Sequence, residues 1–155
     1  MSRYHWALLV GPKREPKRAK GTRYHARNHF LTGGHIQWIF EEQRIGLSAM
    51  NLLLVRVMIG KVKEKHRLVN ALRSIPIRQS EHGWNCVIWV REALEALQAD
   101  GKALGTAVIE WSKVRDAAMT YCQKKRDEHR FDKYGNYDMT KVATYDLIQR
   151  RETIP

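Results

Sequence analysis

The sequence predicts one α+β domain in which strands come first and helices follow. Short segments with alternating apolar residues and turn signals fill the first third of the chain, and helical periodicity dominates from about residue 64. The length of 155 residues suffices for one hydrophobic core, and the hydrophobic content of 43% is typical of a folded protein. We expect residues 1–155 to form this single domain, with a polar tail from about residue 131.

The predicted strands begin at the N-terminus. Residues 3–10 are expected to form the first strand, and residues 22–27 form the returning strand of a hairpin. A turn at Gly33-Gly34 precedes a third strand over residues 35–42. Residues 51–62 are rich in Leu, Val, Ile and Met and predict a buried strand.

Apolar residues at helical spacing predict the helices. The first is expected over residues 64–74, the second over about 86–99 and the third over about 107–127. A further short helix is expected in the tail, over residues 140–150. The apolar stripe of the second helix consists of Val87, Val90, Ala93, Leu94 and Leu97.

The positive charge is concentrated in two segments. The chain has a formal net charge of +12, of which residues 1–30 contribute +7 and residues 56–78 contribute +6. This asymmetry favours a polyanionic partner such as RNA, DNA or an anionic membrane surface. The alternative is a solvated basic surface that serves solubility.

The composition also bears on location and cofactors. Two cysteines, Cys86 and Cys122, do not make a disulfide framework, so we expect a reducing, cytoplasmic location. The N-terminal apolar run covers only Trp6 to Val10, too short for a signal peptide, and no stretch reaches membrane-spanning length. We expect no metal, because no CxxC pair is present, and no cofactor, because there is neither a P-loop nor a GxGxxG motif.

Cys86 and His5 suggest nucleophilic catalysis. Cys86 lies in the first turn of a predicted helix, where backbone N–H groups favour a thiolate and the Cys86 amide is a plausible oxyanion donor. His5 lies on a predicted strand and would accept the thiol proton. A third polar group should orient the imidazole, and His25 is the leading candidate, with Asn28 and His29 as alternatives. In the simpler interpretation, the cysteine is a small buried hydrophobe and the histidines are structural.

Three short motifs resemble the permuted papain-like fold of lecithin:retinol acyltransferase-like enzymes. They are HWALLVG at residues 5–11, RYHARN at residues 23–28 and NCVIWV at residues 85–90, in the same order as in that family. The resemblance implies a small antiparallel sheet packed against helices, with the nucleophile at a helix N-terminus.

The same resemblance implies a catalytic triad of Cys86, His5 and His25. The chain departs from the family after NC, where Val87 and Ile88 replace the usual polar or aromatic pair, and we expect no C-terminal membrane anchor. Both departures weaken the case for lipid substrates.

The opening YHWALLVGPK…GTRYHARN is similar to that of small fungal proteins, the arginine-containing cyclodipeptide synthases. This similarity implies a cytoplasmic transferase that joins arginine to a second amino acid, with arginyl-tRNA and a second aminoacyl-tRNA as partners and no membrane. Phosphate contacts to tRNA would suit the charge of +12. The residues expected to bind tRNA are Lys13, Arg14, Lys17, Arg18 and Lys20, with Lys61, Lys63, Lys65 and Arg67 as a second patch.

Two other functions compete with this expectation. One is a cysteine hydrolase or acyltransferase that acts on a peptide, isopeptide or lipid, and the other is a non-catalytic RNA-binding module. An arginine substrate would also need a carboxylate partner. The sequence does not choose among Glu41, Glu42, Glu81 and Asp100 for that role.

Overall fold

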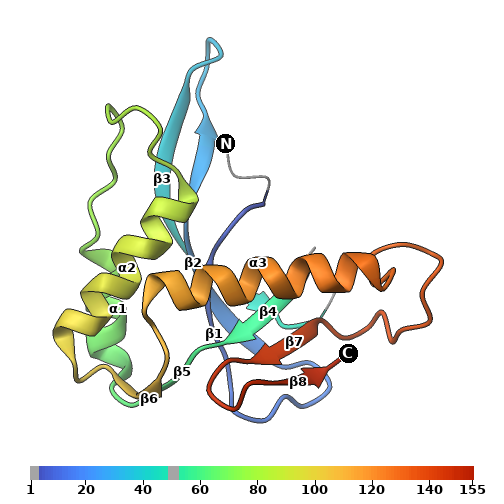
Figure 1. The fold of residues 1–155 in the computed structure, drawn as a ribbon. Coiled ribbons are helices and arrows are strands. Elements are labelled where there is room, and N and C mark those ends of the chain that lie inside the picture. Colours follow the sequence, from blue (N-terminus) through green and yellow to red (C-terminus); the bar gives the residue numbers. More distant parts are fainter. Residues whose placement is uncertain (1–3, 49–52) are drawn as a thin grey trace.

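The computed structural model describes residues 4–48 and 53–155, which form a mixed α+β structure (Figure 1). Its elements in chain order are β1 (Leu8–Val10), β2 (Lys20–Phe30), β3 (Ile36–Gly46), β4 (Val55–Met58), β5 (Gly60–Val62), α1 (Lys65–Arg73), α2 (Cys86–Asp100), β6 (Leu104–Ala107), α3 (Trp111–Asp127), β7 (Ala143–Asp146) and β8 (Arg151–Ile154). Within the described residues the strands form three small sheets, in the orders β1-β2-β3, β4-β7-β8 and β5-β6. The α+β class is confirmed, whereas the permuted papain-like arrangement stays a prediction.

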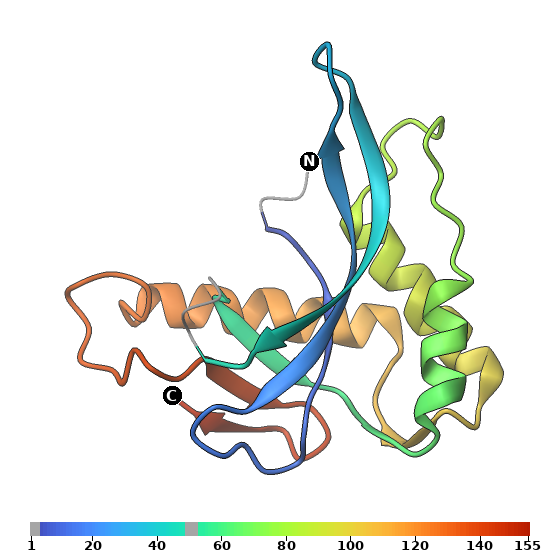
Figure 2. The ribbon, with the colours of Figure 1, turned by 180° about the vertical axis from the view of Figure 1, so that it is seen from behind.

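The β2–β3 hairpin projects from the rest of the molecule (Figures 1 and 2). Its strands pair antiparallel, each with 11 residues, and are longer than predicted. The predicted turn is confirmed, since Gly33 and Gly34 have φ of 88° and 82°, a region that glycine enters without strain. β1 pairs antiparallel with β2 but begins only at Leu8, so residues 4–7 of the predicted first strand lie outside it.

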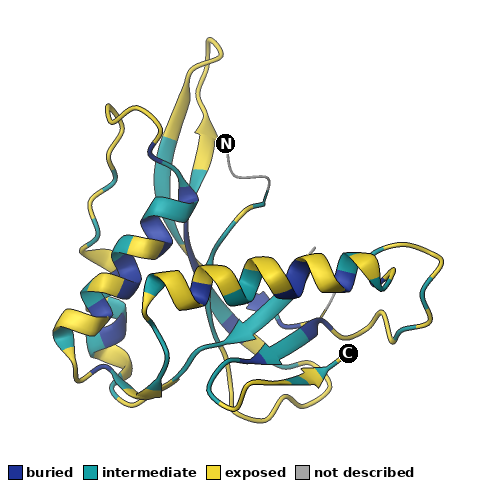
Figure 3. Cartoon of the chain, viewed as in Figure 1, coloured by how far each residue is buried: buried dark blue, intermediate teal, exposed yellow. Residues whose placement is uncertain are grey.

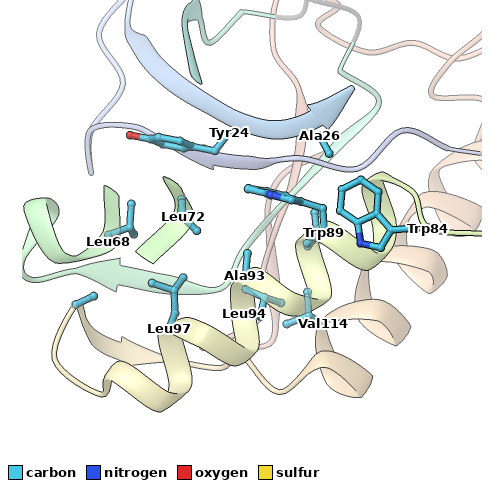
Figure 4. Close-up of a cluster of buried hydrophobic side chains, with 12 residues drawn as sticks. Tyr24, Ala26, Leu68, Leu72, Trp84, Trp89, Ala93, Leu94, Leu97 and Val114 are labelled. Atoms are coloured by element: carbon cyan, nitrogen blue, oxygen red, sulfur yellow. The ribbon is translucent and has the colours of Figure 1, made fainter. Parts of the chain in front are cut away.

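The hydrophobic core lies between one face of the hairpin and the helices α1 and α2 (Figure 4). Trp89 of α2 is fully buried, with 0% of its surface exposed, and its ring centroid lies 5.8 Å from that of Phe40. One side of α2 is buried and the other exposed (Figure 3). The predicted stripe is confirmed except at Val87, which is half-buried, while Trp89 is buried in the core.

The predicted strand over residues 51–62 is two strands in different sheets, and its first two residues lie outside the described part. β4 pairs with β7 and β5 pairs with β6, and β4 is half-buried rather than buried. The predicted third helix also begins too early, because Ala107 is the last residue of strand β6 and α3 starts at Trp111. Strand pairing with β5 overrides helical propensity there.

The predicted helix over residues 140–150 is wrong. This part of the tail forms β7 and β8, and β7 pairs parallel with β4. The side chain of Asp146 accepts hydrogen bonds from the backbone N–H groups of Ile148 and Gln149, each at 2.9 Å, which turns the chain between the two strands. None of the helices in residues 4–48 and 53–155 is long and apolar enough to cross a membrane.

Candidate active site

The structure brings together two predicted site residues, His5 and His25, and adds Glu41. Nε2 of His5 lies 2.6 Å from Nδ1 of His25, and the ring centroids are 4.9 Å apart in an edge-to-face arrangement. The other nitrogen of His25, Nε2, lies 3.0 Å from Oε1 of Glu41. These three side chains form a hydrogen-bond chain that runs from exposed His5 through His25, which is 3% exposed, to half-buried Glu41.

The register of the hairpin creates this chain. Antiparallel pairing around the turn at Gly33 places His25 directly opposite Glu41, and directly opposite side chains share one face of a sheet. β1 pairs with the same strand, Leu8 opposite Tyr24, so the segment that precedes β1 runs alongside β2 and brings His5 to His25.

Two arginines keep Glu41 ionised. Nε of Arg27 donates to Oε2 of Glu41 at 2.6 Å, and Arg23 lies 3.6 Å from Oε1. The hydrogen bond from His25 lowers the pKa of Glu41 most, and the contact with Arg27 lowers it further. The carboxylate is therefore negative and only accepts hydrogen bonds.

The negative charge on Glu41 determines which atom donates in each of the two hydrogen bonds, His25–Glu41 and His5–His25. Nε2 of His25 must carry the proton that it donates to Glu41, and because burial lowers the pKa of His25, its Nδ1 is an acceptor. Nε2 of His5 is then the donor to that nitrogen. Partial burial, helped by His25 and Arg23, lowers the pKa of His5 to about 4. Neutral His5 thus presents an unprotonated Nδ1.

Cys86 is the first residue of α2, as the sequence predicts. The side chain of Asn85 caps the helix and accepts hydrogen bonds from the N–H groups of Val87 at 2.9 Å and Ile88 at 3.2 Å. The amide N–H of Cys86 makes no hydrogen bond within the described residues, which suits the predicted oxyanion donor. The thiol, however, belongs to a residue that is only 7% exposed.

The His25–Glu41 pair and the core that α2 packs against lie on different faces of the hairpin. Side chains alternate between the faces of a strand, so Ala26 and Phe40, which pack toward α2, face away from the His25–Glu41 pair. No hydrogen bond joins Cys86 to either histidine in the described chain. The nucleophile assignment of Cys86 stays a prediction.

The alternatives for the third site residue do not reach His5. Asn28 and His29 are exposed near the hairpin tip, and within the described residues neither makes a hydrogen bond to His5. The position next to His5 belongs to His25, which suits its predicted orienting role.

The four carboxylates considered for an arginine substrate already have partners in this chain. Glu41 accepts a hydrogen bond from His25 in the hydrogen-bond chain described above. The others pair with arginines: Glu42 with Arg73 at 2.7 Å, Asp100 with Arg67 at 2.7 Å, and Glu81 with Arg78 at 3.7 Å.

The predicted basic residues lie on two neighbouring elements. The loop between β1 and β2 carries the first four and the start of β2 carries Lys20, all exposed, and the second patch follows from β5 into α1. Lys65 of that patch lines the same open hollow as Arg14, Arg18 and Lys20. Arg67 is instead held by Asp100.

Sequence reasoning missed Glu41 as the third member of the histidine chain, and it missed Arg44 in the hollow. A signal for Glu41 was present, because a hairpin turn centred on Gly33 pairs residue 25 with residue 41. Arg44 had no comparable signal, since its position depends on the fold of the loop that precedes β2.

The fold and the site together define an α+β protein with a histidine–histidine–carboxylate chain on a β-hairpin. The chain belongs to a family of unknown function, DUF6914, whose family model matches residues 1–154. No curated protein and no solved structure matches it. Within residues 4–48 and 53–155, no cluster of His, Cys, Asp and Glu side chains is arranged to hold a metal ion.

Proposed function

We propose that the chain is a transferase that takes aminoacyl groups from tRNA, arginine among them, and joins two of them as a cyclic dipeptide. The observation that carries the proposal is the hydrogen-bond chain from Glu41 through His25, which presents Nδ1 of exposed His5 as a base. The motif resemblance supplies the substrate class.

His5 would move the protons of the reaction. Its Nδ1 takes a proton from the attacking amine and returns it to the tRNA hydroxyl that leaves. The imidazolium formed in between is stabilised through His25 by the carboxylate of Glu41, as in a triad that orients its base with a buried acid. An aminoacyl ester is already activated, so this chemistry needs no nucleotide hydrolysis.

Cys86 would carry the first aminoacyl group. Its thiolate attacks the ester carbonyl, a thioester forms, and the tRNA hydroxyl leaves with the proton that the thiol has lost. The amine of the second aminoacyl group attacks the thioester and releases the thiol. The remaining amine then attacks the second ester, which closes the ring and frees the second tRNA.

A specific observation favours a second candidate, a non-catalytic RNA-binding module. Cys86 is buried and makes no hydrogen bond to His5 within the described residues, while unpaired cations line an open hollow. In that case Cys86 is a packed residue, and the histidine chain only fixes the N-terminal segment to β2.

Mass spectrometry of products tests the proposal. Purified protein is incubated with arginyl-tRNA and a mixture of other aminoacyl-tRNAs, and cyclic dipeptides are measured. We expect His5→Gln and Cys86→Ser to lower the yield roughly 100-fold or more, the usual effect of losing a catalytic base or nucleophile. Two matched controls, His66→Gln at an exposed histidine and Cys122→Ser at the other buried cysteine, should retain the yield.

Each outcome separates the alternatives. If His5→Gln fails but Cys86→Ser retains the product, the thioester is wrong and the amine attacks the ester directly. Hydrolysis of the ester without any cyclic product would indicate a hydrolase. A wild-type protein that binds RNA but consumes no aminoacyl ester would establish the binding module.

A further inference from the structure

An open hollow at the base of the β1–β2 loop gathers five cationic side chains. We call it the basic hollow and define it by Arg14, Arg18, Lys20, Arg44 and Lys65. The cations come from four parts of the chain: the loop, the start of β2, the end of β3 and the first turn of α1. The remaining lining residues are valine, glycine, proline, alanine and threonine, so no carboxylate lines it.

The arginines of the basic hollow differ from the others in this protein. Eight of the fifteen described arginines form an ion pair with a carboxylate, as Arg73 does with Glu42 and Arg67 does with Asp100. Within residues 4–48 and 53–155, the side chains of Arg14, Arg18 and Arg44 make no ion pair or hydrogen bond, and among the arginines only the side chain of Arg150 is also without one. Like charges held together without a counter-charge repel one another, so this arrangement favours binding of an external anion.

The loop that carries Arg14 and Arg18 is held against the second sheet by an ion pair. Its single acidic residue, Glu15, is turned toward Arg56 of β4 at 2.7 Å, and Arg56 also bonds Thr144 of β7. Glu15 therefore anchors the loop beside the second sheet (Figure 2) and neutralises none of the cations in the hollow. Pro12 and Pro16 restrict the backbone further. A rigid loop loses little conformational entropy when it binds a ligand.

The start of α1 adds to the positive field. Lys65 is the first residue of this helix, and its N-cap Glu64 makes no side-chain capping bond. The carboxylate of Glu64 is turned toward Arg67 instead, at 3.6 Å. The N-terminal end of the α1 dipole thus meets the hollow beside Lys65, which favours negative charge there.

We propose that the basic hollow binds consecutive backbone phosphates of an RNA strand without reading its bases. Five cations suit several phosphates at once, and the absence of aromatic side chains among the residues that line the hollow removes the usual platform for base stacking. The inference deepens the proposed function and rests on it for the choice of RNA, since the hollow would hold the tRNA phosphates. Arg44 is an additional phosphate contact, because it belongs to neither of the two basic patches predicted from the sequence.

Binding of uncharged RNA tests the inference independently of catalysis. We compare wild type with the triple variant Arg18→Gln, Arg44→Gln, Lys65→Gln, using a tRNA transcript, an RNA of unrelated sequence and equal length, and inorganic tripolyphosphate. The control variant Lys102→Gln, Lys141→Gln, Arg150→Gln removes the same charge from exposed positions outside the hollow. Thermal unfolding verifies that both variants fold.

We expect the hollow variant to bind both RNAs roughly 10- to 100-fold more weakly, with a log–log salt dependence less steep by about 2 to 3, and the control to change far less. Equal losses in the two variants would overturn the inference, because net charge alone would explain them. So would a strong preference for one RNA sequence that the hollow variant abolishes, or tripolyphosphate binding with no RNA binding. Since no acyl group is present, failure of the proposed chemistry leaves this result unaffected.

Discussion

At the scale of single residues, His5 combines an exposed imidazole with a pKa of about 4. Partial burial is the main cause, and the neighbouring His25 and Arg23 act in the same direction. With this pKa, the imidazole of His5 is neutral over the whole physiological pH range. The chain of hydrogen bonds behind it decides which nitrogen is free to accept a proton.

The low pKa of His5 predicts how stability depends on pH. Between pH 6.5, the unfolded pKa of this histidine, and about pH 4, its folded pKa, the unfolded state binds more protons than the folded state. The free energy of unfolding therefore falls as the pH falls through this window. Above pH 6.5, the contribution of His5 no longer depends on pH. Urea unfolding at pH 7 and pH 5 measures this effect. The free energy of unfolding should fall less between the two pH values for His5→Gln than for wild type. An equal loss in both proteins would contradict the low pKa.

Glu41→Gln tests the far end of the histidine chain. The amide still accepts from His25, but the negative charge is lost, so we expect the pKa of His25 to fall and product formation to drop roughly 10-fold or more. NMR titration of the imidazole resonances measures the first effect, and mass spectrometry of the products measures the second. Glu42→Gln is the matched control, because Glu42 pairs with Arg73 instead.

At the scale of elements, the start of α2 depends on its cap. Asn85→Ala removes the acceptor for two backbone N–H groups, so we expect the free energy of unfolding to fall by about 1 kcal/mol. Chemical denaturation measures this change. Asn70→Ala, at an exposed position inside α1, should cost far less, and a similar cost at both sites would show that the cap contributes nothing.

Elements with a local signal were predictable and elements paired over long distances were not. Turn glycines and alternation identify the β2–β3 hairpin, and helical spacing identifies α1 and α2. By contrast, β7 is a strand because β4 pairs with it, and the sequence of neither segment indicates which strand it pairs with. The same division holds in the site: His5 and His25 were predictable from their motifs, whereas the position of Cys86 relative to them depends on which face each strand residue occupies.

At the scale of the whole molecule, a cluster of ion pairs around the buried Lys125 joins α3 to the C-terminal strand. Lys125 of α3 is 1% exposed, and its Nζ lies 2.6 Å from Glu152 of β8 and 2.7 Å from Glu128. The hydroxyl of Tyr121 donates to the same Glu152 at 2.7 Å. A buried lysine with two carboxylates and this hydroxyl holds together parts of the chain that the sequence analysis treated as helix and tail.

Lys125→Met should destabilise the protein by about 1.5 to 3 kcal/mol, because it removes the charged hydrogen-bond donor of two carboxylates that water partly screens. Urea denaturation followed by circular dichroism provides the measurement. Lys124→Met, at a side chain that is 60% exposed, should cost under about 1 kcal/mol. The double variant Lys125→Met, Glu152→Leu should recover part of the loss, and a loss larger than that of the single variant would contradict this account.

The parallel pair β4–β7 has a consequence for synthesis of the protein. Arg56 and Thr144, which face each other across this pair, are 88 residues apart in the chain. A nascent chain that has emerged as far as α2 exposes β4 without its neighbour, and an unpaired strand is a template for unwanted association. Folding of this half must wait until β7 has been made, and such distant contacts form slowly. We therefore expect the growing chain to need chaperone protection on the ribosome.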